Sequence, residues 1–105
     1  MPILKFNGTT EAQVKAYATK VDELVDLIVA KPEAILMMSN DNNVYAAQNT
    51  NKRIYVEVDW LARPEEARVA LVKHLTDFFG GEGITVSVKF TEINKHLYVN
   101  NNRMG

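Results

Sequence analysis

The second residue of the chain is a proline, and it is the first position whose chemistry depends on where the protein begins. Pro2 precedes a short apolar run, Ile3 to Phe6, which predicts a strand at the amino terminus. Proline is tolerated there because the first residue of a strand need not donate a hydrogen bond. If Met1 is removed, Pro2 carries a free secondary amine, and a neutral amine in apolar surroundings can act as a general base or a nucleophile. A retained Met1 acylates that nitrogen and leaves no basic amine.

Two cations and two carboxylates are the other candidates for chemistry. Lys31 and Arg63 fall at predicted junctions between helices and strands, where they can bind an acidic substrate, although position alone favours an ordinary solvated charge for each. Glu57 and Asp59 point to one side of a predicted strand, roughly 7 Å apart. That separation is loosely compatible with a carboxylate-pair mechanism, but a polar sheet face explains it better.

Metal and cofactor chemistry is not expected. His74 lies in a predicted helix and His96 in the tail, and neither has a partner at the spacing of metal ligands. No cofactor-binding motif accompanies them, so we predict neither a metal nor another cofactor. A methionine pair at Met37 and Met38 indicates core packing.

Length and composition predict one ordinary globular domain over residues 1–105. The net charge of −1 gives no basic surface for nucleic acid, so no nucleic-acid partner is expected. The chain has no cysteine, no signal-peptide pattern and no apolar run of membrane-spanning length. We therefore expect a cytoplasmic protein that binds no membrane.

The first half of the sequence predicts a β-α-β unit. Thr10 and Gln13 form a capping box that begins a helix, and this helix should end near Ala30 because Pro32 excludes the preceding residue from helical geometry. The run 35–38 then predicts a buried strand. Residues 40–53 are rich in asparagine and predict a hairpin-like excursion, with a short strand over 44–47.

The second half repeats this order. Apolar and polar residues alternate over 54–60, which predicts a strand. Pro64 marks the start of a second helix, Gly80 marks its end, and a second alternating strand covers 84–90. In the tail, residues 96–99 are expected to pair briefly with another segment. Right-handed crossovers place both helices on one face of a four-stranded sheet. The other face shows Tyr55, Glu57, Asp59, Thr85, Ser87 and Lys89.

Three segments together carry a resemblance: MPILKFNG at the start, YVEVDWLAR before the second helix, and VKFTEINKHLYVNNN near the end. With them the sequence resembles small bacterial proteins of unassigned function in the tautomerase superfamily. These are relatives of macrophage migration inhibitory factor and 4-oxalocrotonate tautomerase. The likeness covers essentially the whole chain.

The resemblance implies an α+β fold with a β-α-β-β-α-β protomer, a four-stranded mixed sheet and two helices on one face. It also implies a homotrimer and a keto–enol tautomerase that acts on a small carboxylate-bearing substrate. Pro2 then corresponds to the general base in a pocket at a subunit interface, and the Lys31–Pro32 step corresponds to a carboxylate-binding lysine. The matched substrate-binding positions are Lys31, Arg63, Trp60 and Tyr98.

Two other classes of function stay open at the level of sequence. One is a trimer of the same fold that binds or scaffolds without catalysis. The other is a ferredoxin-like module that binds a small molecule, because the repeated β-α-β pattern alone does not separate the two folds.

Overall fold

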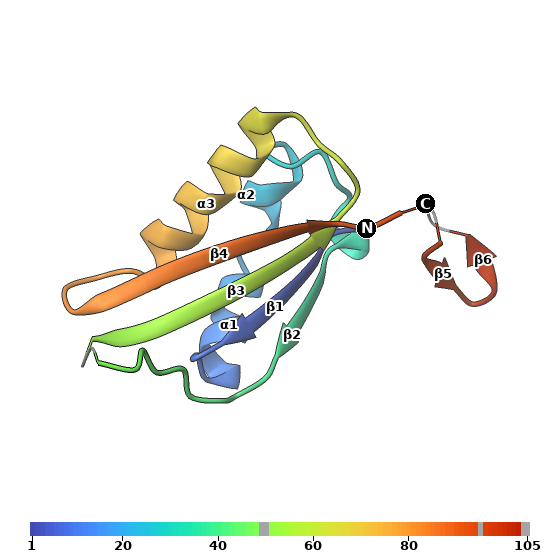
Figure 1. Ribbon diagram of the computed structural model, residues 1–105. Coiled ribbons are helices and arrows are strands. Elements are labelled where there is room, and N and C mark those ends of the chain that lie inside the picture. Colours follow the sequence, from blue (N-terminus) through green and yellow to red (C-terminus); the bar gives the residue numbers. More distant parts are fainter. Residues whose placement is uncertain (49–50, 95, 104–105) are drawn as a thin grey trace.

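Four strands form one mixed sheet in the order β2-β1-β3-β4 in the computed structural model, which describes residues 1–48, 51–94 and 96–103. β1 (Ile3–Asn7) runs parallel to β2 (Leu36–Ser39) and antiparallel to β3 (Lys52–Trp60), and β3 runs parallel to β4 (Ile84–Glu92). Each parallel pair is joined by a helical crossover (Figure 1). The predicted α+β fold with a four-stranded mixed sheet is confirmed.

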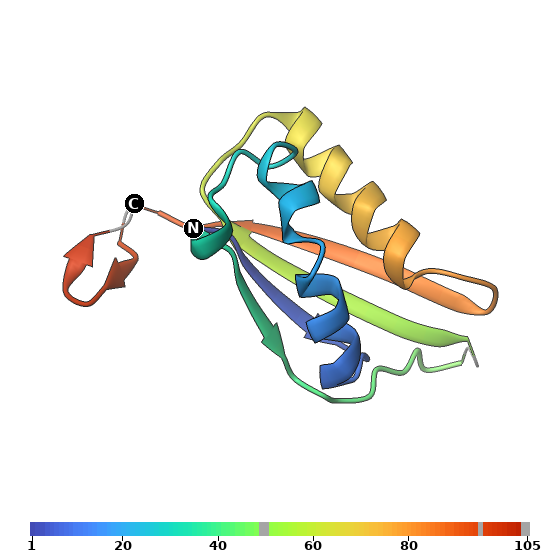
Figure 2. The same cartoon turned by 180° about the vertical axis from the view of Figure 1, so that it is seen from behind.

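Three α-helices lie on one face of this sheet: α1 (Glu11–Ala18), α2 (Val21–Val25) and α3 (Glu65–Phe79) (Figure 2). α1 and α2 replace the single first helix that the sequence predicts. The break has a local cause, because the Thr19 hydroxyl and amide both donate to the Ala16 carbonyl and tighten the last turn. The predicted capping box is present, with Thr10 as N-cap and Gln13 as its partner. A short 3₁₀ helix, η1 (Pro32–Ala34), leads into β2.

The core lies between the sheet and the helices. Alternation along β1 and β3 turns one set of side chains toward the helical layer, and the helices supply an apolar stripe in return. The buried apolar residues are Leu4, Phe6, Val14, Tyr17, Leu24, Ile28, Ile35, Ile54, Val56, Val58, Trp60, Ala67, Leu71, Leu75 and Phe79. This packing holds β1 in place, and therefore also Pro2 at its amino end.

No helix covers the opposite face of the sheet, in the part of the chain that the structure describes (Figures 1 and 2). The prediction of a buried β2 is wrong: Leu36 is 45% exposed and Met38 is 46% exposed, because β2 is an edge strand and both side chains point to this open face. On the same face Lys5 forms an ion pair with Asp59, at 2.8 Å. The hydrogen bond from Lys5 to Asp59 raises the lysine pKa.

Two further segments complete the described chain. Residues 44–47 form an isolated bridge at Ala46 and not the predicted strand. In the tail, β5 (Tyr98–Val99) pairs with β6 (Asn102–Arg103), which confirms that part of residues 96–99 pairs briefly. None of the described helices is long and apolar enough to cross a membrane.

Candidate active site

The amino end of β1 lies where several element ends converge (Figure 1). Pro2 is fully buried, and its carbonyl accepts a hydrogen bond from the Leu36 amide at 2.9 Å, which ties the start of β2 to it. β3 and β4 finish at this same end of the sheet, where the Ile93 amide donates to the Trp60 carbonyl at 2.7 Å. We call this end of the sheet the amino-terminal edge. η1 lies next to this edge, and Lys31 is its exposed N-cap residue.

Arg63 is held rigidly beside this edge. Its Nε donates to the Ile28 carbonyl at 2.7 Å, and its Nη1 donates to the Leu61 carbonyl at 3.0 Å. The guanidinium carbon lies 5.1 Å from the ring centroid of Trp60, at cation–π distance. Nη2 keeps its donors available, among the described residues, for a planar carboxylate.

The ring of Trp60 packs against the guanidinium of Arg63. Its side chain is only 3% exposed, and its ring lies 4.9 Å from that of Phe90, between centroids. An indole buried to this extent does not face solvent. The Trp60 ring therefore contacts the Arg63 guanidinium from within the core and presents little surface to solvent in this chain.

The amino-terminal amine is electrostatically coupled to Arg63. Burial lowers the pKa of the Met1 amine below its ordinary value, and the positive charge of Arg63 lowers it further. Burial likewise lowers the pKa of Arg63, although an arginine stays charged at neutral pH. The amine that begins this chain thus lies where its neutral, basic form is favoured.

The predicted site residues separate into two groups in space. Pro2, Arg63 and Trp60 lie at one edge of the sheet, next to the backbone that carries Lys31. Tyr98 lies on the β5–β6 hairpin, which stands away from the body of the protein (Figure 1).

Sequence reasoning missed the groups that hold Arg63 in place. The chain turns sharply after α2: the Ala30 amide donates to the Val25 carbonyl at 3.1 Å, and Val29 lies in the left-handed region at φ 53°. Because of this turn, the Ile28 carbonyl points toward Arg63 and accepts its hydrogen bond. Valine rarely adopts that conformation, so no residue-type signal predicts the turn. The separation of 35 residues between Ile28 and Arg63 also hides their contact.

The carboxylates of β3 are each engaged elsewhere. Asp59 pairs with Lys5, and Glu57 accepts a hydrogen bond from Asn7 Nδ2 at 3.2 Å. Both are therefore elements of a polar network on the open face. Across the described residues, no group of three or more His, Asp or Glu side chains is arranged to hold a metal ion.

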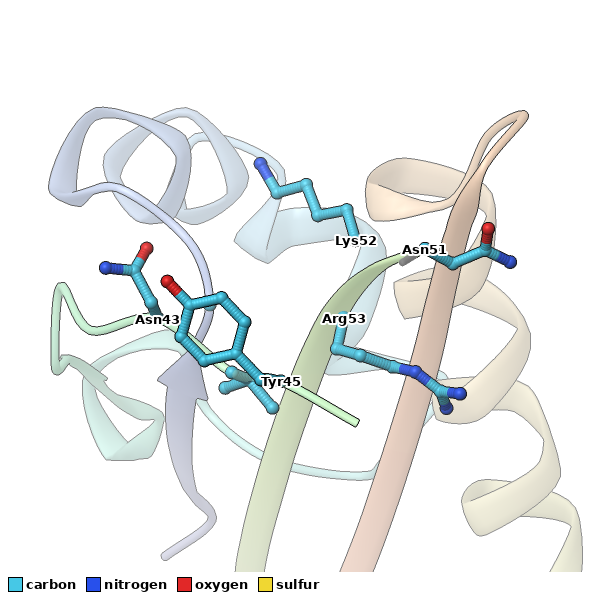
Figure 3. A pocket seen from close by; sticks show the side chains of 7 residues that line it. Asn43, Tyr45, Asn51, Lys52 and Arg53 are labelled. Carbon is cyan, nitrogen blue, oxygen red and sulfur yellow. The ribbon is translucent and has the colours of Figure 1, made fainter. Parts of the chain in front are cut away.

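A cavity of about 510 Å³ opens at the far end of the sheet, beyond the last residue of β1. Figure 3 shows Lys52 leaning toward the side of Asn43 and Tyr45, while Arg53 and Asn51 extend in the other direction across β4. Because β1 and β3 are antiparallel, the start of β3 lies a full strand length from Pro2. This cavity is therefore separate from the amino-terminal edge.

Comparison with protein families gives a match over nearly the whole chain. The family described as Domain of unknown function (DUF1904) matches residues 1–104. The chain belongs to this family. Among curated proteins, none matches the sequence.

Solved structures extend the comparison to the fold. A DUF1904 domain from Sebaldella termitidis superposes with a TM-score of 0.84 at 17% identity, over 99% of this chain and 100% of that one. Macrophage migration inhibitory factor from Oncomelania hupensis gives 0.75 at 10% identity, over 96% and 95%. Malonate semialdehyde decarboxylase, solved also with its initial proline replaced by alanine and in an inactivated form, gives 0.67 at 20% identity, over 93% and 89%. The DUF1904 chain thus has the tautomerase-superfamily fold.

Proposed function

We propose that the chain, processed to begin at Pro2, is a cytoplasmic homotrimeric tautomerase that interconverts the keto and enol forms of a small carboxylate-bearing substrate. One observation carries the proposal: Pro2 is fully buried at the amino end of β1, next to the Met1 amine, whose pKa is lowered by burial and by the charge of Arg63. Removal of Met1 transfers the amine to Pro2, whose ring is fully buried at the same edge and gives the nitrogen a fixed direction.

The reaction follows from a neutral amine next to a cation. The Pro2 nitrogen accepts a proton from the enol hydroxyl, and the resulting ammonium returns that proton to the adjacent carbon, which forms the ketone. In the reverse direction the same nitrogen takes the proton from carbon. The Nη2 donors of Arg63, with Lys31, hold the carboxylate and stabilise the enolate charge. A positioned base of this kind supplies about 10²–10⁴-fold in rate.

One solved structure with this fold supports the role of an initial proline, and the open sheet face of this chain supports assembly. Malonate semialdehyde decarboxylase, whose structure has this fold, was also solved as a variant in which alanine replaces its initial proline. Helices cover only one sheet face here, and Leu36 and Met38 on the other face are about half exposed. A trimer that covers this face removes apolar surface from water.

The test is a rate measured on protein whose mass confirms that it begins at Pro2, with an enol acid such as enolic phenylpyruvate as substrate. We expect ketonisation to rise with pH as the Pro2 amine loses its proton, because only the neutral form is a base. Pro2→Ala keeps an amine but makes it primary and less constrained, so the rate should fall about 10²-fold or more without loss of assembly.

The rates of three forms of the protein are compared: the processed protein, the Met1-retaining protein and Pro2→Ala. The Met1-retaining protein is the matched control, since it has the same fold and no amine on Pro2. Equal rates for the processed protein, the Met1-retaining protein and Pro2→Ala would mean that the proline is structural, and a non-catalytic binding protein would then be the better account.

A further inference from the structure

The asparagine-rich segment after β2 is tied to the end of β1 by its side-chain amides. Asn7 Oδ1 accepts hydrogen bonds from Nδ2 of Asn40 at 2.7 Å and from Nδ2 of Asn42 at 2.9 Å. In return, Asn42 Oδ1 accepts a hydrogen bond from the Gly8 amide at 2.9 Å. Asn7 itself is buried, so this network is anchored in the body of the protein. The residues that follow Asn42 therefore start from a fixed point.

A close approach of two backbones gives the cavity beyond β1 a fixed wall. Gly8 lies at φ 83°, and a Cβ atom at this position would collide with the Arg53 carbonyl oxygen. Only glycine lets the end of β1 pass so close to the start of β3. The Lys52 amide also donates to the Gly83 carbonyl at 3.0 Å, which fixes the first residue of β3. The cavity, of about 510 Å³, lies within the range of small-molecule sites, about 300–1,000 Å³.

Three side chains at this cavity have groups available for a ligand. Tyr45 is 83% exposed, whereas its neighbour Val44 is half-buried. The side chains of Asn43 and Lys52 are exposed, and neither has a hydrogen-bond or ion-pair partner among the described residues. Lys52 leans toward the side of Asn43 and Tyr45 (Figure 3). A cation, a carboxamide and an open aromatic ring thus surround one cavity.

The charge of the cavity favours an anion. None of the described residues that line it carries a carboxylate, whereas Lys52 and Arg53 are two consecutive cations. Arg53 extends in the other direction across β4 (Figure 3). Lys52 is therefore the cation that faces the tyrosine ring and the carboxamide. An ammonium without a carboxylate partner forms charge-assisted hydrogen bonds to the oxygens of a phosphate.

We propose that this cavity binds a nucleoside monophosphate, with the base on the ring of Tyr45, the edge of the base on Asn43 and the phosphate on Lys52. Every base has a flat face that stacks on an aromatic side chain. A carboxamide presents a donor and an acceptor side by side and pairs in this way with the edge of adenine. A net charge of −1 provides no basic track for a longer nucleic acid.

This nucleotide site is separate from the candidate active site. All of its residues belong to one chain, at the end of the sheet opposite Pro2. The inference therefore needs neither a neighbouring copy nor tautomerase activity, and a failed tautomerase assay would leave it unchanged.

Calorimetry and NMR titration with adenosine monophosphate test the binding. We expect saturable binding of one nucleotide per chain, with amide shifts concentrated at residues 8, 43–45 and 52–53. Adenosine lacks the phosphate and ribose phosphate lacks the base, so each should bind at least about tenfold more weakly. The inference would be overturned by an absence of binding, by equal affinity for ribose phosphate, or by tighter binding of a short oligoadenylate.

Substitutions locate the bound nucleotide. Tyr45→Ala and Lys52→Gln should each weaken its binding about tenfold or more, because they remove the stacking surface and the phosphate contact. Arg53→Gln is the matched control: it removes the same charge from the next residue, whose side chain extends elsewhere, and should change affinity by less than about twofold.

Two results would contradict this placement. Equal weakening by Lys52→Gln and Arg53→Gln would mean that the protein attracts anions without a defined site. Lys31→Ala tests the amino-terminal edge and should keep the affinity for adenosine monophosphate. Lost affinity in Lys31→Ala, together with unchanged affinity in Lys52→Gln, would place the nucleotide at that edge instead.

Discussion

Replacement of Arg63 by alanine is the sharpest perturbation of the amino-terminal edge. The side chain donates to the carbonyls of Ile28 and Leu61 and lies over Trp60, so it joins the end of α2 to the end of β3. Arg63→Ala leaves both carbonyls without that partner. It also removes the positive charge that lowers the pKa of the amino-terminal amine.

The size of the effect follows from these contacts. A hydrogen bond from a charged donor contributes about 1.5 kcal/mol at the lower end of its range, and a cation–π contact adds about 0.5 kcal/mol. The two bonds and the ring contact of Arg63 together give about 3 kcal/mol of unfolding free energy, since the guanidinium is half-buried and water can replace part of what is lost. With a urea m-value of about 1.5 kcal/mol/M, the midpoint should fall by about 2 M.

Urea unfolding followed by fluorescence measures this directly, because Trp60 is the only tryptophan and contacts Arg63. Circular dichroism is recorded in parallel, and protein concentration is kept constant because assembly shifts apparent stability. Arg68→Ala is the matched control: Arg68 is exposed and pairs with Glu65 at 3.1 Å on the same helix, so its loss should change stability by less than about 0.5 kcal/mol. Equal losses for the two variants would refute the assignment of Arg63 as a structural tie.

The charge and the hydrogen bonds of Arg63 can be separated. Arg63→Lys keeps the cation but not the forked donor geometry, so it should lose stability while the amine pKa stays low. Arg63→Ala should lose stability and also raise the amine pKa, because the repulsion of the protonated amine is gone. A titration of the processed amine by NMR distinguishes them. An unchanged pKa in Arg63→Ala would show that burial alone sets it.

Three further substitutions have expected outcomes. Val29→Gly should raise the unfolding free energy by about 1 kcal/mol, because glycine relieves a φ of 53° at an exposed position; no gain in thermal stability would contradict this. Tyr17→Phe should lower it by about 1 kcal/mol by removing the 2.8 Å hydrogen bond to His74 while keeping the buried ring, and an unchanged urea midpoint would argue against that bond. Glu57→Gln should keep any tautomerase activity of the processed protein within a few-fold, since Asn7 occupies this side chain; abolished activity in an intact oligomer would favour the carboxylate mechanism.

Local patterns predicted the elements well where a short stretch of sequence holds all the information. The capping box at Thr10, the alternating strand that became β3, and the limits of α3 between Pro64 and Gly80 each depend on residues within a few positions. The prediction of one continuous first helix failed, although the cause is equally local. Its apolar stripe runs on past Thr19, but the hydroxyl of that threonine bonds to the Ala16 carbonyl and ends the turn. The apolar periodicity of the sequence carries no information about this side-chain hydrogen bond to the helix backbone.

Contacts between distant residues were beyond the reach of any pattern. Tyr17 of α1, His74 of α3 and Glu23 of α2 form a hydrogen-bonded chain across three helices, at 2.8 and 2.9 Å, although the sequence offers His74 no partner at a recognisable spacing. Burial raises the pKa of Tyr17, and the bond to His74 lowers the pKa of Glu23. The exposure of β2 was hidden in the same way, because an apolar run reads alike whether its strand is central or at an edge.

By itself, then, the sequence determined the order of strands and helices, the proline that follows Met1, and the candidate cations Lys31 and Arg63. Only the tertiary structure decided which of these residues lie close together. It brought Arg63 to the amino terminus through the Ile28 carbonyl, buried Trp60 beneath it, and left Tyr98 on an outward hairpin. The physical reason is one of range: backbone propensity and side-chain periodicity act over a few residues, whereas a site is assembled by packing that joins segments tens of residues apart.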